Sequence, residues 1–152
     1  MLERTPLRIR TTGSFDRPGY KVEKLVYETQ PELFVTANLY IPKTGKPPYP
    51  GVLFQLGHSV NGKAAAPYQK CCQGLAQLGF LVLSFDTMGQ GERAYYPGAT
   101  SPLTRLRSAD DEHTLPGQQM LLLVDWSRAS GAPQIMQQWI GTFTESAPRW
   151  SR

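Results

Sequence analysis

Alternating and continuous apolar runs divide the first half of the chain into strand-like segments. Residues 33–41 place apolar side chains at every second position, which is typical of a half-buried strand, and residues 20–28 form a second candidate strand. The segment 29–32 between them favours a turn, so the sequence predicts an antiparallel hairpin. Two uncharged runs, 51–56 and 80–85, have the pattern of strands covered on both faces, as in a parallel sheet.

A helical pattern connects these two buried runs. Apolar residues recur at spacings of three and four from Tyr68 to Leu78, Pro67 suits the first turn of a helix, and Gly79 favours its end. A strand, a helix and a strand in this order predict one βαβ crossover. The preceding segment 42–50 contains four prolines, so we expect a surface loop there.

Three parts of the chain differ in character. We expect an extended lead-in over residues 1–19, one domain over 20–123, and an atypical tail over 124–152. The segment 94–114 is polar and rich in turn residues, which favours an irregular loop. The tail holds all three tryptophans and has no buried-strand run, so we expect a truncated or frame-shifted terminus. A short helix at about 134–140 with a frayed end is compatible with that expectation.

Composition and charge exclude several classes of function. The net charge is +4, but the basic residues never form a block of five or six, so we expect no nucleic-acid partner. The amino terminus lacks the apolar core of a signal peptide and no run has the length of a membrane span, which predicts a cytoplasmic protein with no membrane contact. Adjacent Cys71 and Cys72 and two isolated histidines predict no disulfide and no metal site.

Two polar loops that contain glycine follow the two buried strands. Carboxyl ends of neighbouring parallel strands meet at one edge of a sheet, so we expect the functional site where these loops come together. The segment Gly89-Gln90-Gly91 permits positive φ, and it either lines a substrate cleft or only turns a tight corner. We expect Asp86 to cap the following turn rather than act in catalysis, and Glu92 and Arg93 to pair with nearby loops.

The two loops, together with the exit Ile41-Pro42 from the hairpin, resemble those of α/β-hydrolases, closest to the acetyl xylan esterase and dienelactone hydrolase-like branch. The resemblance implies a partial three-layer αβα fold, in which an antiparallel hairpin leads into a mainly parallel sheet. It also implies hydrolysis of a carboxylic ester, such as a small-molecule ester or an acetylated carbohydrate, without a cofactor. Met88 stands where the Arg-Gly-Gln-Gly signature of carbohydrate acetyl esterases has arginine.

The resemblance does not extend to a nucleophile. Enzymes of this superfamily place the nucleophilic serine in a Gly-x-Ser-x-Gly elbow, and no serine of this chain has glycine at both flanking positions. A cysteine nucleophile is not expected either, because Cys72 lies within the helical pattern. We therefore expect an esterase fragment that retains the oxyanion loop and is inactive alone. The alternatives are a non-catalytic binding module that uses an exposed sheet edge, and an elbow supplied by a partner chain.

His58 and Ser59, in the first loop, allow two interpretations. In the first, which the resemblance implies, backbone amides near Ser59 form part of an oxyanion hole and His58 shapes the loop. In the second, Ser59 is the nucleophile, since Asp86 and His113 follow it in the order serine, acid, histidine. The turn signal Asn61-Gly62 argues against the second, because an elbow serine sits at the start of a helix. We expect His113 to be a surface or capping residue.

The segment 51–56 is also a candidate for self-association. In the strand order of α/β-hydrolases it would lie between 80–85 and the elbow strand that this chain does not show. An apolar strand left at the edge of a sheet presents unpaired backbone groups to other chains. The sequence therefore predicts possible self-association through this strand.

Overall fold

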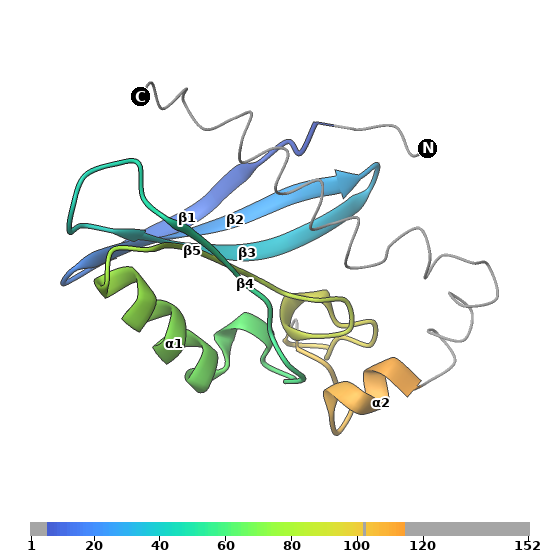
Figure 1. The fold of residues 1–152 in the computed structure, drawn as a ribbon. Coiled ribbons are helices and arrows are strands. Elements are labelled where there is room, and N and C mark those ends of the chain that lie inside the picture. The colour runs from blue at the N-terminus through green and yellow to red at the C-terminus, as the bar shows by residue number, and fades with distance from the viewer. Residues whose placement is uncertain (1–5, 102, 115–152) are drawn as a thin grey trace.

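The computed structural model describes residues 6–101 and 103–114. In this part of the chain five strands form one sheet, in the spatial order β1-β2-β3-β5-β4 (Figure 1). The strands are β1 (Arg10–Arg17), β2 (Tyr20–Gln30), β3 (Leu33–Pro42), β4 (Gly51–Phe54) and β5 (Leu81–Phe85).

Two α-helices and two short 3₁₀ turns accompany the sheet. The helix α1 (Ala66–Gln77) connects β4 to β5 and packs against β3 and β5 on one face of the sheet (Figure 1). The short helix α2 (Ala109–Thr114) comes after the irregular segment that follows β5. The 3₁₀ turns, Gly62–Ala64 and Gly91–Arg93, lie in the two loops that follow β4 and β5.

The strand pairings confirm the hairpin and the crossover. Strands β2 and β3 are antiparallel and are joined by the turn at Pro31-Glu32, where Glu32 adopts a positive φ of 66°. Strands β4 and β5 are parallel, with Val52 opposite Val82, and α1 connects them. The strand β3 joins these two units by pairing antiparallel with β5. Among the described strands the sheet is therefore mixed, with one parallel pairing at its β4 end.

The segment expected to be an extended lead-in contains the strand β1, which pairs antiparallel with β2. Seven of its eight residues are exposed, and Gly13 is the exception. An exposed strand needs no alternation of apolar and polar residues, so no periodic signal marks it in the sequence. Gly13 and Pro18 further weakened the pattern, because both residue types are usually punctuation between elements.

The strands bury side chains on both faces of the sheet. On the α1 face, the helix packs Cys72 and Ala76 against a cluster from the strands. The opposite face carries a second cluster, to which Leu7 is added from the segment before β1. The strand members of the first cluster are Tyr20, Val22, Tyr40 and Val82; those of the second are Leu25, Tyr27, Val35, Ala37, Leu83 and Phe85. Burial on both faces is what the uncharged run in β5 predicted.

The remaining predictions concern the segments after β5. The segment 94–114 is irregular as expected, except for an isolated bridge between Pro97 and Thr104 and the short helix α2. The tail predicted over 124–152 and its short helix lie outside the described residues. Among the described residues, no helix is long and apolar enough to cross a bilayer.

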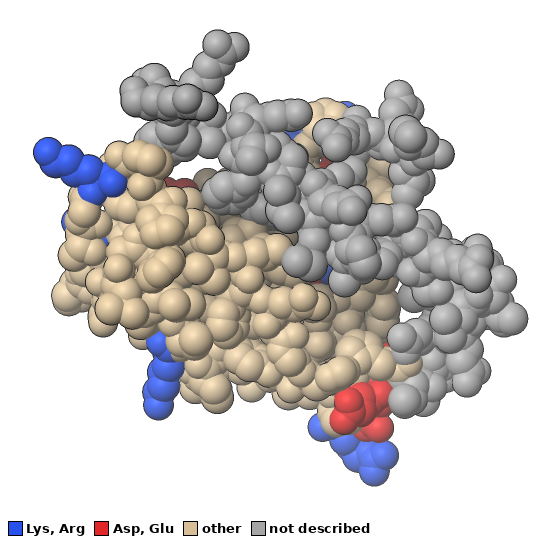
Figure 2. Space-filling view, viewed as in Figure 1, with Lys and Arg blue, Asp and Glu red and all other residues tan. Residues whose placement is uncertain are grey.

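The surface charge follows the scatter expected from the sequence. On the face shown in Figure 2, the described lysine and arginine side chains stand apart from one another at the margins of the molecule. Several lysines and arginines of the described residues are paired with acids, for example Lys43 with Asp16 and Arg107 with Asp111. The described part of this face therefore presents separated charges rather than one basic patch.

Candidate functional site

The loops that follow β4 and β5 lie side by side at the carboxyl ends of these parallel strands. We call residues 57–63 the first loop and residues 86–93 the second loop. The two 3₁₀ turns within them are in contact, and the amide of Gly91 donates a hydrogen bond to the carbonyl of Val60 at 3.2 Å. The meeting of the two loops, predicted from the parallel pairing of their strands, is confirmed.

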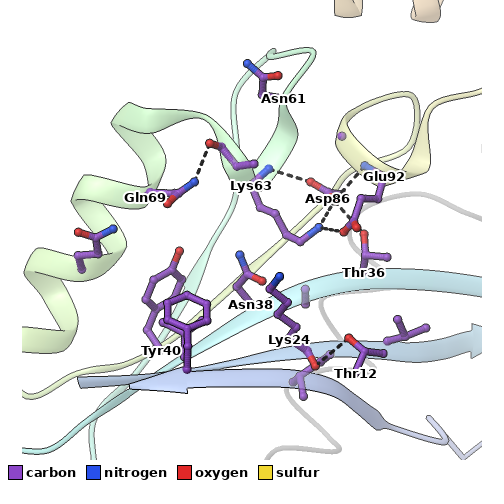
Figure 3. A pocket seen from close by; sticks show the side chains of 18 of the residues that line it. Thr12, Lys24, Thr36, Asn38, Tyr40, Asn61, Lys63, Gln69, Asp86 and Glu92 are labelled. Carbon is purple, nitrogen blue, oxygen red and sulfur yellow. Dashed lines mark hydrogen bonds and ion pairs between the residues drawn. The ribbon is translucent and has the colours of Figure 1, made fainter. Parts of the chain in front are cut away.

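Asp86 bonds to both loops through its buried carboxylate and so connects them. Its side chain is fully buried, and its carboxylate accepts hydrogen bonds from the amide of Lys63 at 2.7 Å and from the hydroxyl of Thr36 at 2.8 Å (Figure 3). The amide of Glu92 donates to it at 3.3 Å. Asp86 therefore caps the turn that follows β5, as the sequence predicted, and also bonds to the first loop and to β3.

Lys63 completes this cluster as a buried cation between two carboxylates. Its side chain is 8% exposed, and its Nζ forms ion pairs with Asp86 and Glu92 (Figure 3). Arg93 donates to the carbonyl of Asp86 at 3.1 Å, and burial lowers the pKa of its guanidinium from the usual value. The expected pairing with a nearby loop is confirmed for Glu92, whereas Arg93 bonds within its own loop. The sequence did not indicate Lys63, because nothing in its neighbourhood distinguishes it from a surface lysine.

Two glycines make room for the buried carboxylate. Gly62 and Gly91 have positive φ values of 50° and 56°, in the region that favours glycine. A Cβ at Gly62 would overlap with the carboxylate of Asp86 and would lie 2.9 Å from the Cα of Gly91. A Cβ at Gly91 would lie 2.5–2.9 Å from three atoms of the same carboxyl group. The close approach of the two loops therefore depends on both glycines.

Gln90 joins the loops a second time, through its side chain. Its Oε1 accepts the amide hydrogen of Ser59 at 2.6 Å, and its Nε2 donates to the hydroxyl of Thr87 at 2.6 Å. The residue is 4% exposed. Of the two alternatives for Gly89-Gln90-Gly91, the described contacts give the tight corner, with positive φ at both glycines. A role in substrate binding stays a prediction.

Most backbone amides of the first loop are occupied by partners within the protein. The amide of Asn61 donates to the Ser59 hydroxyl at 3.2 Å, and the amide of Gly62 donates to the Ser59 carbonyl at 2.9 Å. The amides of Ser59 and Lys63 donate to Gln90 and Asp86. Three amides have no hydrogen-bond acceptor among the described residues: those of Gly57, His58 and Val60.

Two of these unoccupied amides lie at the surface, since Gly57 and His58 are exposed. Backbone donors are nearly always paired with protein, water or a ligand, so these two are available to a ligand that displaces water. Leu56, which directly precedes Gly57 in the chain, is buried. The first loop therefore has two adjacent amides, in exposed residues, that have no acceptor in the described part of the chain, and Asp86 and Gln90 fix the rest of the loop.

Ser59, Asp86 and His113 do not bond to one another. The Ser59 hydroxyl accepts from the amide of Asn61, and the Asp86 carboxylate is occupied by the cluster around Lys63. Both ring nitrogens of His113 are engaged elsewhere, Nδ1 with His58 and Nε2 with a backbone carbonyl. The order of these residues along the chain suggested a triad, but the described contacts contain none.

His113, expected to be a surface or capping residue, meets the first loop instead. Its Nδ1 lies 3.0 Å from Nε2 of His58, and its Nε2 lies 2.9 Å from the carbonyl oxygen of Met88. The two rings are 5.0 Å apart between centroids, at an angle of 73°. The sequence could not predict this contact, because α2 is short and had been assigned to an irregular loop.

A hollow of about 690 Å³, lined by both apolar and polar side chains, lies beside the buried cluster, between α1 and the hairpin (Figure 3). Lys63, Asp86 and Glu92 border it at one end. Burial raises the pKa of the Tyr40 hydroxyl in its wall to about 12, so this phenol stays neutral. Other lining side chains are Thr12, Lys24, Thr36, Asn38 and Gln69. The sequence did not indicate the hollow, since one wall is the unpredicted strand β1.

The cysteines and the acidic residues give no second reactive centre in the described part of the chain. Cys72 is buried in α1, and burial raises the pKa of its thiol to about 11, so it is not a thiolate nucleophile. Cys71 is exposed on the same helix. Among the described residues, no three histidine, cysteine, aspartate or glutamate side chains are placed to hold a metal ion.

Comparisons with known proteins give matches among solved structures. No protein-family model matches the chain, and a search of curated proteins found no match. Methylesterase BT1017 superimposes with a TM-score of 0.56 and 25% sequence identity over 84% of this chain. A Bacteroides fragilis protein provisionally named as an acetyl xylan esterase superimposes with a TM-score of 0.63 and 19% identity over 90% of this chain.

These likenesses define the class of fold. The described sheet, with its antiparallel hairpin and its parallel crossover, is a partial α/β-hydrolase fold. The chain spans 27% of the length of Methylesterase BT1017 and 38% of the length of the Bacteroides fragilis protein. The expected resemblance to esterases is confirmed at the level of the fold.

Proposed function

We propose that this chain provides the oxyanion-loop portion of a carboxylic-ester hydrolase, and that it does not hydrolyse esters alone. The observation that carries the proposal is the pair of amides at the exposed residues Gly57 and His58, which have no acceptor among the described residues and lie on a loop that follows a parallel strand. The names of the two structural neighbours, a methylesterase and an acetyl xylan esterase, support the choice of esters as the reaction class.

The chemistry that such amides perform is charge stabilisation. Attack on an ester carbonyl converts its oxygen to an oxyanion, and fixed N–H donors at about 2.7–3.1 Å from that position lower the barrier. One such donor is worth about 10²–10³ in rate. The contacts around the first loop favour His58 and Gly57 as donors over Ser59, because the Ser59 amide is already bonded to Gln90.

Rigidity of the first loop is the second requirement. A donor contributes most when it needs no reorganisation as the charge develops. The Ser59 amide and the Lys63 amide, on either side of the loop tip, are held by Gln90 and Asp86 at 2.6 and 2.7 Å. We propose that these two side chains of the second loop position the oxyanion donors. The main role of Gly89 and Gly91 in this proposal is to allow that arrangement, and contact with substrate is secondary.

The proposed substrate is a small-molecule or carbohydrate ester. The reaction class requires no cofactor, because a serine nucleophile and a histidine base complete it in related folds. This chain has no Gly-x-Ser-x-Gly, and Ser59 has no imidazole partner among its described contacts. The nucleophile is therefore proposed to come from polypeptide other than the described residues.

An ester-hydrolysis assay tests the proposal. With p-nitrophenyl acetate, the chain and its Ser59→Ala variant are both expected to give the rate of buffer alone. Ser101→Ala is a matched control, because the Ser101 hydroxyl also accepts an amide two residues further on, from Leu103 at 3.2 Å. Turnover that Ser59→Ala abolishes and Ser101→Ala leaves intact would contradict the proposal and establish Ser59 as the nucleophile.

The alternative is a non-catalytic binding module that uses the edge of the sheet. The strand β4 supports it, since this strand ends the sheet order and pairs on one side with β5 among the described strands. An edge strand can add a strand from another molecule, including a second copy of this chain. A rise in melting temperature with an added ligand, without turnover in the assay above, would favour this alternative.

A further inference from the structure

The two histidines of the chain meet across the candidate site, one from each of two separate segments. His58 belongs to the first loop and His113 to α2. The contact joins Nε2 of His58 to Nδ1 of His113 at 3.0 Å. The histidine pair therefore links the first loop directly to α2, a helix that belongs to neither loop.

The neighbouring carbonyl fixes which ring nitrogens carry hydrogen. The carbonyl oxygen of Met88 can only accept a hydrogen bond, so Nε2 of His113, at 2.9 Å, must be the donor. When His113 is neutral, its Nδ1 is then an acceptor. The hydrogen between the two rings consequently belongs to Nε2 of His58. With hydrogen on Nε2 of each ring, both hydrogen bonds form: His58 donates to His113, and His113 donates to the carbonyl of Met88.

A first proton leaves this arrangement intact. It can bind Nδ1 of His58, which takes no part in the contact, and His58 then donates to His113 as a cation. Hydrogen bonds from a charged donor are stronger than neutral ones. The carboxylate of Asp110 lies beside this donor, with its Oδ1 3.8 Å from Nε2 of His58.

A second proton removes the contact. It must bind Nδ1 of His113, because Nε2 already carries hydrogen, and it turns the acceptor of the pair into a donor. Two imidazolium rings then face each other with hydrogen on both opposed nitrogens. Neither ring can accept, and the two positive charges repel. The His58 side chain is 62% exposed, so protons reach the pair from solvent.

We propose that His58 and His113 form a proton-dependent contact, which holds α2 against the first loop while His113 Nδ1 is unprotonated and releases it when both rings are charged. The inference goes beyond the proposed function, since it concerns the arrangement of the loops and requires no ester chemistry. It makes the site region sensitive to acid through the two histidines of the chain.

The other charged groups around the pair are occupied by partners of their own. Glu112 is fully buried and accepts the amides of Tyr95 and Tyr96 at 2.8 and 3.2 Å. Burial raises the pKa of Tyr95, which keeps this phenol neutral. The remaining groups and their partners are Asp111 with Arg107, Lys63 with Asp86 and Glu92, and Arg93 with the carbonyl of Asp86. Asp110, whose Oδ1 lies 3.8 Å from Nε2 of His58, is the carboxylate next to the His58 ring.

Two features decide how α2 moves when the histidine contact is broken. The lack of a side chain at Gly89 leaves room for the His113 ring, because a Cβ at Gly89 would lie 2.7 Å from two atoms of that ring. Glu112 remains bonded to the segment after the second loop at any pH at which it is ionised. Loss of the contact should therefore loosen the end of α2 that carries His113 and free the His58 ring, without detaching the helix.

Nitrogen NMR of the ¹⁵N-histidine-labelled chain tests the proposal, since two histidines give two ring systems. At about pH 8 the proposal predicts two neutral rings with hydrogen on Nε2, and an inter-ring nuclear Overhauser effect should be present. At about pH 4.5 both rings should carry two hydrogens, the inter-ring effect should vanish, and amides of the first loop and α2 should shift together.

Hydrogen exchange on the same samples provides a second readout. After correction for the intrinsic effect of pH, loss of one hydrogen bond should speed exchange of α2 amides about two- to tenfold. In His58→Ala, α2 should exchange at this faster rate at both pH values. Hydrogen on Nδ1 of His113 at about pH 8, or an inter-ring effect that persists with both rings charged, would overturn the proposal. A His113 ring that stays neutral wherever the chain is folded would overturn it equally.

Discussion

Replacing Asp86 with alanine is expected to lower the free energy of unfolding by about 3–5 kcal/mol, which is the usual cost of removing one partner of a buried ion pair. The variant would leave Lys63 as a buried cation with Glu92 as its remaining partner, and Glu92 is half exposed. It would also leave the amide of Lys63 and the hydroxyl of Thr36 without their acceptor. Urea denaturation followed by circular dichroism measures the change.

Asp16→Ala is the matched control for this experiment. Asp16 also pairs with a lysine, Lys43, at 2.7 Å, but both side chains are exposed. Exposed pairs contribute little, so the urea midpoint of this variant should stay close to that of the unmodified chain. If Asp86→Ala shifted the midpoint no more than Asp16→Ala does, the buried cluster would not be what holds the two loops together.

Gly62→Ala is expected to destabilise the chain by about 2 kcal/mol or more. The substitution forces a residue with a side chain into a φ of 50° and places its Cβ against the Asp86 carboxylate. The nearest backbone atom, the Cα of Gly91 in the second loop, lies 2.9 Å from the added carbon, so rotation of one side chain cannot relieve the overlap. Thermal or urea unfolding of the variant provides the measurement.

The matched control is the same substitution at Gly74. This glycine is exposed within α1, and a Cβ there would meet no atom within 4 Å. Alanine is favoured over glycine in a helix by about 0.5–1 kcal/mol, so Gly74→Ala should raise stability by about that amount. Equal effects of the two substitutions would mean that the loops do not pack around Asp86 as described.

The parts of the fold that could be predicted are those with a strong local period. The strands β2, β3, β4 and β5 and the helix α1 all carry apolar residues at regular spacing, and each was expected within a few residues of its observed bounds. The strand β1 was not, because its exposed residues pack against no core and carry no periodic signal. The short helix α2 lacked such a signal because its six residues make fewer than two turns, too few for a helical period to repeat.

The candidate site could be located from the sequence, but its contacts could not. Strand ends followed by glycine-containing loops predicted where the site lies. The bond from Gln90 to the Ser59 amide joins residues 31 positions apart, and the ion pair of Lys63 with Asp86 joins residues 23 positions apart. Such pairings depend on how the two loops are placed relative to each other in space. The spacing of residues along the chain does not determine that placement. The same holds for the histidine pair, 55 positions apart.

Site-resolved amide hydrogen exchange across the first loop, measured by NMR, most directly tests whether this loop presents free donors from a fixed base. The amides of Ser59 and Lys63 should be protected, because Gln90 and Asp86 accept their hydrogens. The amides of Gly57 and His58 should exchange close to the rate of an unstructured peptide. Protection of Gly57 and His58 together with rapid exchange at Ser59 would contradict the proposed oxyanion donors.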